Sequence, residues 1–164
     1  MKNIVLIGMP GAGKSTIGVL LAKSLLMDFV DTDLIIQKKC SAALCEIIEK
    51  EGTERFIEIE DEVISQSDFE NTVIATGGSA VYGKNAMKKL LSDAVSVYLR
   101  VSVEELEKRL SNIQTRGVAM KEGTTVMDLF DERRPLYEKY AHFTLDCDGL
   151  TAEECVNRIV SFLS

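Results

Sequence analysis

A lysine and a serine follow a glycine-rich turn near the start of the chain, in the segment GMPGAGKS at residues 8–15. The segment fits the pattern G-x-x-x-x-G-K-[ST], which binds phosphate when a strand precedes it and a helix follows. Glycines allow the sharp turn and let successive backbone N–H groups face phosphate oxygens. The positive end of the helix dipole strengthens that attraction. A plain strand-to-helix connection is the alternative, but motif and context together favour a phosphate site.

This loop predicts the binding of ATP or GTP. Lys14 is placed to reach the β- and γ-phosphates, and the hydroxyl of Ser15 is placed to ligate Mg²⁺. Such a loop does not by itself distinguish a kinase from a nucleotide-dependent switch or motor. The residues expected to hold the nucleotide are Gly11, Ala12, Gly13, Lys14, Ser15 and Thr16.

Acidic residues and glycines follow the next two predicted strands. The sequence DTD places Asp31 and Asp33 at the end of one strand, and TGGS at residues 76–79 follows the other. Open α/β sheets hold their ligands at the carboxyl ends of the strands. Two acids one residue apart in a β segment point to the same side, so one could serve the metal while the other takes a proton from an acceptor hydroxyl. Helix capping and a plain turn are the alternatives.

Four arginines in the second half of the chain could face a polyphosphate. Arg109 and Arg116 flank the start of the polar segment 111–125, and Arg133 and Arg134 open the sequence RRPLY. Arginine side chains can spread the charge that develops as a γ-phosphoryl group moves. The alternative for any one of them is a solvated surface charge.

The composition is that of an ordinary globular protein of 164 residues, with 46% hydrophobic and 27% charged residues. This length predicts a single domain over residues 1–164. The formal charge of −7 argues against a nucleic-acid partner, which needs clustered lysine and arginine. The four cysteines and one histidine lack the spacing of a zinc site. With no signal peptide or membrane-length apolar run, we expect a cytoplasmic monomer with no membrane partner.

Short apolar segments alternate with amphipathic segments along the chain. Strands are predicted at residues 3–8, 29–31, 71–78, 94–100 and 142–146, and helices at residues 14–26, 34–50, 53–67, 84–91, 103–110, 126–140 and 151–163. The polar segment 111–125 predicts a mobile loop. Strands that are apolar on both faces and alternate with helices predict an α/β fold, with helices on both faces of a parallel sheet.

These motifs, taken in order, resemble those of the shikimate kinase family. They are GMPGAGKSTIG, DTD, GTERFIEIE, TGGSAV, an arginine in the following loop, and RRPLY, and the resemblance covers nearly all of the chain. It implies a three-layer P-loop kinase fold of the nucleoside-monophosphate-kinase type with a five-stranded parallel sheet. It also implies a substrate-binding helical region at about residues 32–60 and a mobile lid at about residues 111–124.

The reaction implied by the resemblance is transfer of the γ-phosphoryl group of ATP to the 3-hydroxyl of shikimate, in aromatic amino acid biosynthesis. Lys14 and Arg116 would neutralise the phosphates, and Arg109 would lie beside the adenine. Ser15 and Asp31 would serve Mg²⁺.

Four further residues would form the acceptor site on the same resemblance. Asp33 would bind and activate the hydroxyl, and Gly77, Gly78 and Arg133 would contact the acceptor. The implied catalytic residues are Lys14, Asp33 and Arg116.

One departure from the family pattern concerns the acceptor carboxylate. The family has an arginine that grips this group where the chain has Ile57, whereas the acid that follows, Glu60, is kept. The missing charge-assisted hydrogen bond would be worth roughly 1.5–3 kcal/mol. Arg55 lies two residues away on a predicted helix and therefore faces another side, which leaves Arg133, with Arg134 beside it, to bind a carboxylate.

Three interpretations stay open from the sequence. The chain is a shikimate kinase with a weakened acceptor site, a related kinase of another hydroxylated acceptor, or a non-catalytic nucleotide-binding regulatory module. The retained Asp33 and Arg116 oppose the third interpretation, because a module that only binds nucleotide needs no acceptor base.

Overall fold

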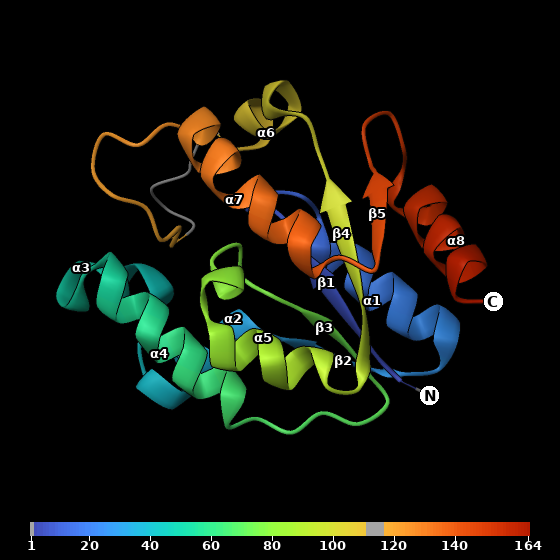
Figure 1. Ribbon diagram of the computed structural model, residues 1–164, viewed down its shortest axis with the longest axis horizontal. Helices are drawn as coiled ribbons and strands as arrows, with labels where there is room; N and C mark the ends of the chain where they lie inside the picture. Colours follow the sequence, from blue (N-terminus) through green and yellow to red (C-terminus); the bar gives the residue numbers. More distant parts are fainter. Residues whose placement is uncertain (1, 111–116) are drawn as a thin grey trace.

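The computed structural model describes residues 2–110 and 117–164, which form a three-layer fold around a central sheet (Figure 1). The strands lie in the order β2-β3-β1-β4-β5, and every neighbouring pair is parallel. In chain order they are β1 (Asn3–Ile7), β2 (Asp28–Asp31), β3 (Thr72–Ala75), β4 (Ala94–Arg100) and β5 (Phe143–Asp146). The predicted α/β fold with a five-stranded parallel sheet is confirmed.

Helices cover both faces of this sheet. On one face α1 (Lys14–Leu25) packs against α8 (Ala152–Leu163), and on the other α5 (Lys84–Leu91) and α7 (Val126–Tyr140) contact β4. The remaining elements are α2 (Thr32–Cys40), α3 (Leu44–Glu51), α4 (Thr53–Ser65), α6 (Val103–Arg109) and the short 3-10 helix η1 (Ala80–Tyr82). Within the described ranges, no helix is both long and apolar enough to cross a membrane.

The single helix predicted over residues 34–50 is wrong, because the structure has two helices there. α2 ends at Cys40 and is followed by its cap residue Ser41, whose φ of 52° places it in the left-handed region. α3 begins after Ala43, whose backbone N–H donates to the Glu46 carboxylate at 2.8 Å. Apolar residues continue at helical spacing across the break, so periodicity alone did not reveal it.

Two groups of buried side chains hold the layers together. All five residues of β1 are buried, as expected for a middle strand covered on both faces. A smaller cluster joins α2, α3 and α4 to the segment that follows residue 116. Its buried members are Ile36, Leu44, Ile47, Phe56, Val63 and Ala119.

The register of the sheet brings three chemically important connections to one edge. Asp31, the last residue of β2, pairs with Ala75 at the end of β3, and Ala75 pairs with Leu6 in β1. The glycine-rich loop, the DTD segment and the TGGS turn therefore leave the sheet at the same level. This edge is where open parallel sheets bind their ligands.

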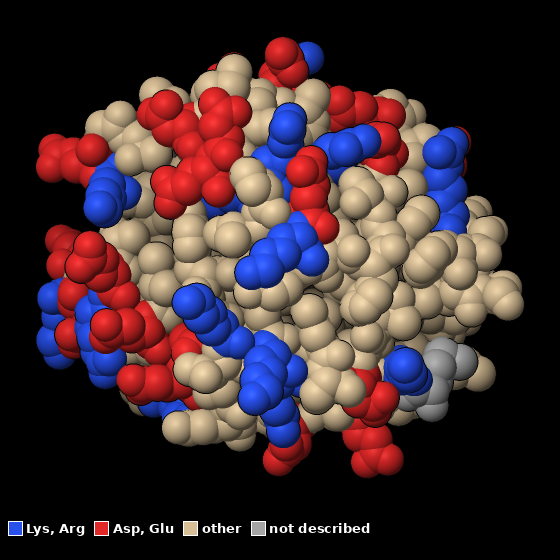
Figure 2. Space-filling view, viewed as in Figure 1, with Lys and Arg blue, Asp and Glu red and all other residues tan. Residues whose placement is uncertain are grey.

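Charged side chains of both signs are interspersed on the face shown in Figure 2. Acidic groups gather in its upper left part, and basic groups lie between them and across its centre. This mixture, together with the formal charge of −7, makes the visible face unlike the continuous basic surfaces that bind polyanions.

Gly18 in α1 allows the helix to lie close to β2, which predicts a stability effect. A Cβ at this position would lie 2.6 Å from Cε2 of Phe29. We expect Gly18→Ala to lower the free energy of unfolding, because overpacking costs about 1–3 kcal/mol and outweighs the gain of roughly 1 kcal/mol in helix propensity. Urea denaturation measures the change.

Ser24→Ala is the control, because Ser24 is exposed on the same helix. Its unfolding free energy should stay equal or rise slightly. A Gly18→Ala protein as stable as Ser24→Ala would contradict the close approach.

Candidate active site

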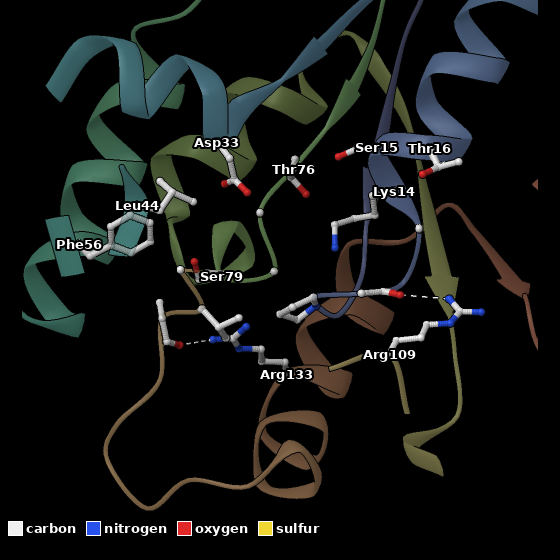
Figure 3. A pocket seen from close by; sticks show the side chains of 18 residues that line it. Lys14, Ser15, Thr16, Asp33, Leu44, Phe56, Thr76, Ser79, Arg109 and Arg133 are labelled. Atoms are coloured by element: carbon white, nitrogen blue, oxygen red, sulfur yellow. Dashed lines mark hydrogen bonds between the residues drawn. The ribbon is translucent and has the colours of Figure 1, made fainter. Parts of the chain in front are cut away.

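A cavity of about 610 Å³ lies at the edge of the sheet where the three connections meet (Figure 3). Asp33 and Lys14 point into this space from α2 and α1, and Arg133 borders it from α7. It is lined by Pro10, Gly11, Gly13, Lys14, Ser15, Thr16, Asp33, Leu44, Phe56, Thr76, Gly77, Gly78, Ser79, Arg109, Gly117, Val118, Ala119 and Arg133. The structure thus brings together loop residues expected to hold a nucleotide and residues expected to meet an acceptor.

The glycine-rich loop has the backbone geometry of a phosphate cradle. Gly8 has a φ of 149°, and a Cβ there would lie 2.7 Å from the backbone oxygen of Leu99. Gly13, with a φ of 93°, is the residue before the first turn of α1. It has no side chain that could cap the N–H groups of that turn. Those free donors, at the positive end of the helix, attract anions. Ala12 is buried behind the loop.

The Lys14 ammonium group lies inside this loop. Its Nζ donates to the backbone oxygens of Gly8 and Met9, both at 2.7 Å. Burial lowers the pKa of Lys14 to about 8, although the charge of Asp33 raises it. Lys14 can therefore exchange its carbonyl partners for phosphate oxygens, which would also favour its charged form.

Ser15 and Asp31 bring two side-chain oxygens into contact beside the cavity. The Ser15 hydroxyl donates to Oδ2 of Asp31 at 2.6 Å, while Oδ1 accepts from the backbone N–H of Asp33 at 2.9 Å. A hydroxyl and a carboxylate in contact suit Mg²⁺, which prefers oxygen ligands and usually keeps waters and substrate phosphates as its others. Among the residues that the structure describes, no three or more His, Cys, Asp or Glu side chains form a group able to hold a metal ion.

The expectation that Asp31 and Asp33 share one side of a strand is wrong. β2 ends at Asp31, and Asp33 lies in the first turn of α2. Asp31 caps that helix, as the capping interpretation expects, and its role as a metal ligand stays a prediction. The helical turn instead aims Asp33 into the cavity.

Asp33 is a half-buried carboxyl group in a strongly polar surrounding. Burial and the nearby charge of Asp31 raise its pKa to about 6, against the opposing charge of Lys14. A Cβ on Gly77 would lie 2.6 Å from Oδ1 of Asp33, so only glycine fits this close approach. A carboxylate with a pKa near neutrality is suited to accept a proton from an alcohol.

Glu60 is a site residue that the sequence did not place in the site. It comes from α4, is 1% exposed, and accepts a 2.6 Å hydrogen bond from Ser79 at Oε1. Its Oε2 has no partner among the described residues and would lie 2.9 Å from a Cβ on Gly77. Burial raises the pKa of Glu60 to about 7, and Asp33 adds to this effect while Ser79 and Arg133 oppose it. The available signal was an acid four residues after Phe56 on the apolar face of α4.

Arg133 is fully buried at the far wall of the cavity. Its Nη2 donates to the backbone oxygen of Ala119 at 2.5 Å. A Cβ on Gly78 would lie 3.0 Å from its Nη1, so the bare glycine makes room for the guanidinium group. Tyr137, also on α7, donates to the backbone oxygen of Gly78 at 2.6 Å and ties this turn to the helix. Arg134 faces the surface, where Nε pairs with Glu138 at 3.4 Å.

Three other arginines were considered from the sequence, and the structure describes two of them, Arg109 and Arg55. Arg109 lies beside the phosphate loop, with Nη1 donating to the backbone oxygen of Gly11 and Nε donating to Glu105, both at 3.0 Å. Residues 111–116 of the predicted lid, Arg116 included, lie outside the described residues. Arg55 pairs at the surface with Glu58 at 2.9 Å and with Glu62 at 3.3 Å, as expected for a side chain that faces away from the cavity.

A five-stranded parallel sheet with a lysine-bearing phosphate loop and an acidic group across one cavity defines a P-loop kinase. The family model "Shikimate kinase" matches residues 10–164. The chain therefore belongs to the shikimate kinase family, and the resemblance seen in its motifs is confirmed.

Relatives and solved structures agree with this assignment. A shikimate kinase of Thermodesulfovibrio yellowstonii is 42% identical over 98% of this chain and 94% of its own length. One from Francisella tularensis subsp. holarctica is 39% identical, with coverage of 99% and 94%. Shikimate kinase from Acinetobacter baumannii in complex with shikimate is 32% identical with a TM-score of 0.89, covering 99% and 93%. The enzyme from Aquifex aeolicus is 31% identical with a TM-score of 0.81, covering 98% and 95%.

The raised pKa of Asp33 predicts an acid limit to activity. Only the ionised carboxylate can accept a proton, so kcat/KM should fall roughly tenfold per pH unit below about 6. A pH profile of kcat/KM for the acceptor at saturating Mg-ATP measures this limit.

Glu60→Gln is the control variant, because it keeps a hydrogen-bond acceptor for Ser79 and removes the second titrating carboxyl group of the pocket. It should retain the limit near pH 6. A limit near pH 4, the usual range of an aspartate, would show that Asp33 does not titrate as this surrounding requires.

Proposed function

We propose that this chain is an ATP-dependent shikimate kinase that produces ADP and shikimate 3-phosphate, with Mg²⁺ as its cofactor. Family membership over residues 10–164 supports this proposal, as does the likeness to a shikimate kinase solved in complex with shikimate. The observation that carries it is the cavity in which Asp33 faces Lys14 and the buried Arg133. This cavity offers a proton acceptor, a phosphate-binding cation and a second cation for an acidic acceptor.

The chemical step follows from these groups. Ionised Asp33 takes the proton of the acceptor hydroxyl while the hydroxyl oxygen forms a bond to the γ-phosphorus of ATP. The bond between the γ-phosphorus and the oxygen that bridges it to the β-phosphate breaks, and this oxygen leaves with ADP. Lys14 and the N–H groups at the start of α1 hold the phosphates while the negative charge shifts toward ADP. Ser15 and Asp31 would hold Mg²⁺, which neutralises phosphate charge when it is bound. Catalysis is then mainly positioning and electrostatic stabilisation.

The acceptor would lie between Asp33 and Arg133. The close approach of Gly77 to Asp33 and of Gly78 to Arg133 leaves bare backbone along this part of the cavity. Arg133 would bind the acceptor carboxylate, and its hydroxyl groups would face Asp33. The helical region at about residues 32–60 contributes Asp33, Leu44 and Phe56 to the lining, which supports its proposed part in substrate binding. The roles of Arg109 at the adenine, and of Arg116 and a lid at about residues 111–124, stay predictions.

A kinase of another hydroxylated acceptor is the second candidate, and Ile57 is the observation that favours it. This side chain is uncharged and half-buried on α4, directly after the cavity-lining Phe56. A non-catalytic nucleotide-binding module is less well supported, because the costly burial of Asp33 and Glu60 near one another has no use in nucleotide binding alone.

The first test is release of ADP with and without shikimate, compared between the native chain and Asp33→Asn. We expect shikimate-dependent ADP from the native chain. Loss of the proton acceptor should lower kcat by about 10²–10⁴-fold, while the affinity for Mg-ATP measured by calorimetry stays within about threefold, because Asp33 does not belong to the phosphate loop.

Asp28→Asn is the matched control, since Asp28 is exposed at the other end of β2. It should leave kcat unchanged. Absence of any acceptor-dependent ADP from the native chain with shikimate would reject the proposed function, whereas ADP formation with another polyol or cyclic acid alone would support the second candidate.

The second test restores a cation at position 57. If the pocket accepts shikimate, Ile57→Arg should lower the KM for shikimate by about ten- to a hundredfold, the value of one charge-assisted hydrogen bond. Ile57→Gln, similar in length but neutral, should change it by less than about threefold. An unchanged KM in Ile57→Arg would mean that no acceptor carboxylate reaches this part of the site.

A further inference from the structure

Tyr82 lies against the guanidinium group of Arg133 through two parts of its side chain. Its hydroxyl accepts a hydrogen bond from Nε at 3.4 Å. The ring lies 5.4 Å from the central guanidinium carbon, measured to its centroid, which is within the range of a cation–π contact. Tyr82 ends η1, the short helix that directly follows the Gly77–Gly78 turn. The same connection thus supplies both the bare turn and a contact to the arginine.

Glu132 fixes the direction of the Tyr82 hydroxyl. The hydroxyl donates to Oε1 of Glu132 at 2.7 Å. A tyrosine hydroxyl has one proton and acceptor lone pairs, so once its proton faces Glu132 its lone pairs remain for the Nε–H of Arg133. Burial and the bond to Glu132 raise the pKa of Tyr82, which keeps that proton in place at neutral pH. The result is a directed chain from Arg133 through Tyr82 to Glu132.

The contacts with Tyr82 and the hydrogen bond to Ala119 occupy two of the three guanidinium nitrogens of Arg133, so the third, Nη1, remains to face the cavity. Nε is held by Tyr82, and Nη2 is held by the backbone oxygen of Ala119 at 2.5 Å. Nη1 lies next to the bare Gly78, and no hydrogen bond joins it to another part of the described chain. Because the guanidinium group is planar, fixing Nε and Nη2 also fixes the direction of Nη1.

We propose that Tyr82, directed by Glu132, is a positioning residue that holds the Arg133 guanidinium group with Nη1 facing the acceptor carboxylate. This inference rests on the proposed function. It deepens that function by naming what fixes the guanidinium group of Arg133, in a site where position 57 holds isoleucine and brings no further cation. An arginine that binds a carboxylate gains affinity from being held in one orientation before binding.

Tyr82→Phe tests the hydroxyl and Tyr82→Leu tests the whole side chain. Loss of one neutral hydrogen bond should raise the KM for shikimate by about three- to tenfold in Tyr82→Phe. Loss of the ring as well should raise it by about ten- to fiftyfold in Tyr82→Leu. The KM for ATP and kcat should stay within about twofold in Tyr82→Phe, because uniform substrate binding affects KM alone.

Two comparisons separate positioning from general packing. The first uses the carboxamide of shikimate as the acceptor, whose neutral amide should make Tyr82→Phe and the native chain differ by less than about twofold. The second repeats Tyr82→Phe in an Arg133→Lys background, where it should add nothing, because lysine has no Nε–H to be held. Glu132→Gln should give part of the effect of Tyr82→Phe, since the amide oxygen still accepts from the hydroxyl.

Tyr140→Phe is the matched control. Tyr140 also faces a cation, with Lys139 Nζ at 5.2 Å from its ring centroid, but it does not line the cavity. All its kinetic constants should match those of the native chain. Thermal unfolding of each variant shows whether it is folded at the assay temperature.

Each outcome decides the inference. A rise in KM limited to shikimate and absent in the Arg133→Lys background supports it. An unchanged KM in both Tyr82 variants overturns it, and so does an equal loss with the carboxamide or with ATP, which would indicate packing. If the native chain does not phosphorylate shikimate, the proposed function fails first, and a positioning role toward its carboxylate fails with it.

Discussion

Two cations and two carboxyl groups lie buried or half-buried around one cavity. The site depends on the balance between the cost of burying these charges and the attraction between them. Lys14 and Arg133 are buried, as is Glu60, and Asp33 is half-buried. Burial alone would discharge most of these groups. Their mutual attraction and the hydrogen bonds from Ser79 and to the loop carbonyls oppose that effect. The remaining shifts bring Asp33 and Lys14 to pKa values of about 6 and about 8, close to those useful for moving a proton and binding phosphate near neutral pH.

Bare backbone makes this density of charge possible. Because Gly77 has no side chain, the carboxyl groups of Asp33 and Glu60 can both lie close to it. Gly78 in the same way leaves room for the guanidinium group of Arg133. The parallel sheet supplies the positions, because its register brings the ends of β1, β2 and β3 to one level. A single side chain such as Ile57 can then differ from the family pattern at the acceptor end while the sheet keeps the phosphate-transfer groups in place.

The sequence predicted the fold and the phosphate loop because their signals are local. Apolar runs, helical spacing and the glycine-lysine-serine pattern each fit within a short segment. What it could not give arises from contacts between distant segments. The hydrogen bond from Ser79 to Glu60 joins residues 19 apart, and that from Arg133 to Tyr82 joins residues 51 apart. The turn at Ser41 was missed for a different reason, since a serine in the left-handed region carries no sequence signal as strong as glycine.

The proposed site requires that the acceptor places its hydroxyl group against Asp33 and its own carboxylate against Arg133. A crystal structure with shikimate and a non-hydrolysable ATP analogue tests it most directly. We expect the 3-hydroxyl oxygen at about 2.6–3.2 Å from an Asp33 oxygen, the carboxylate in contact with Nη1 of Arg133, and the γ-phosphate in contact with Lys14. Shikimate bound in the opposite orientation, or outside this cavity, would contradict the account.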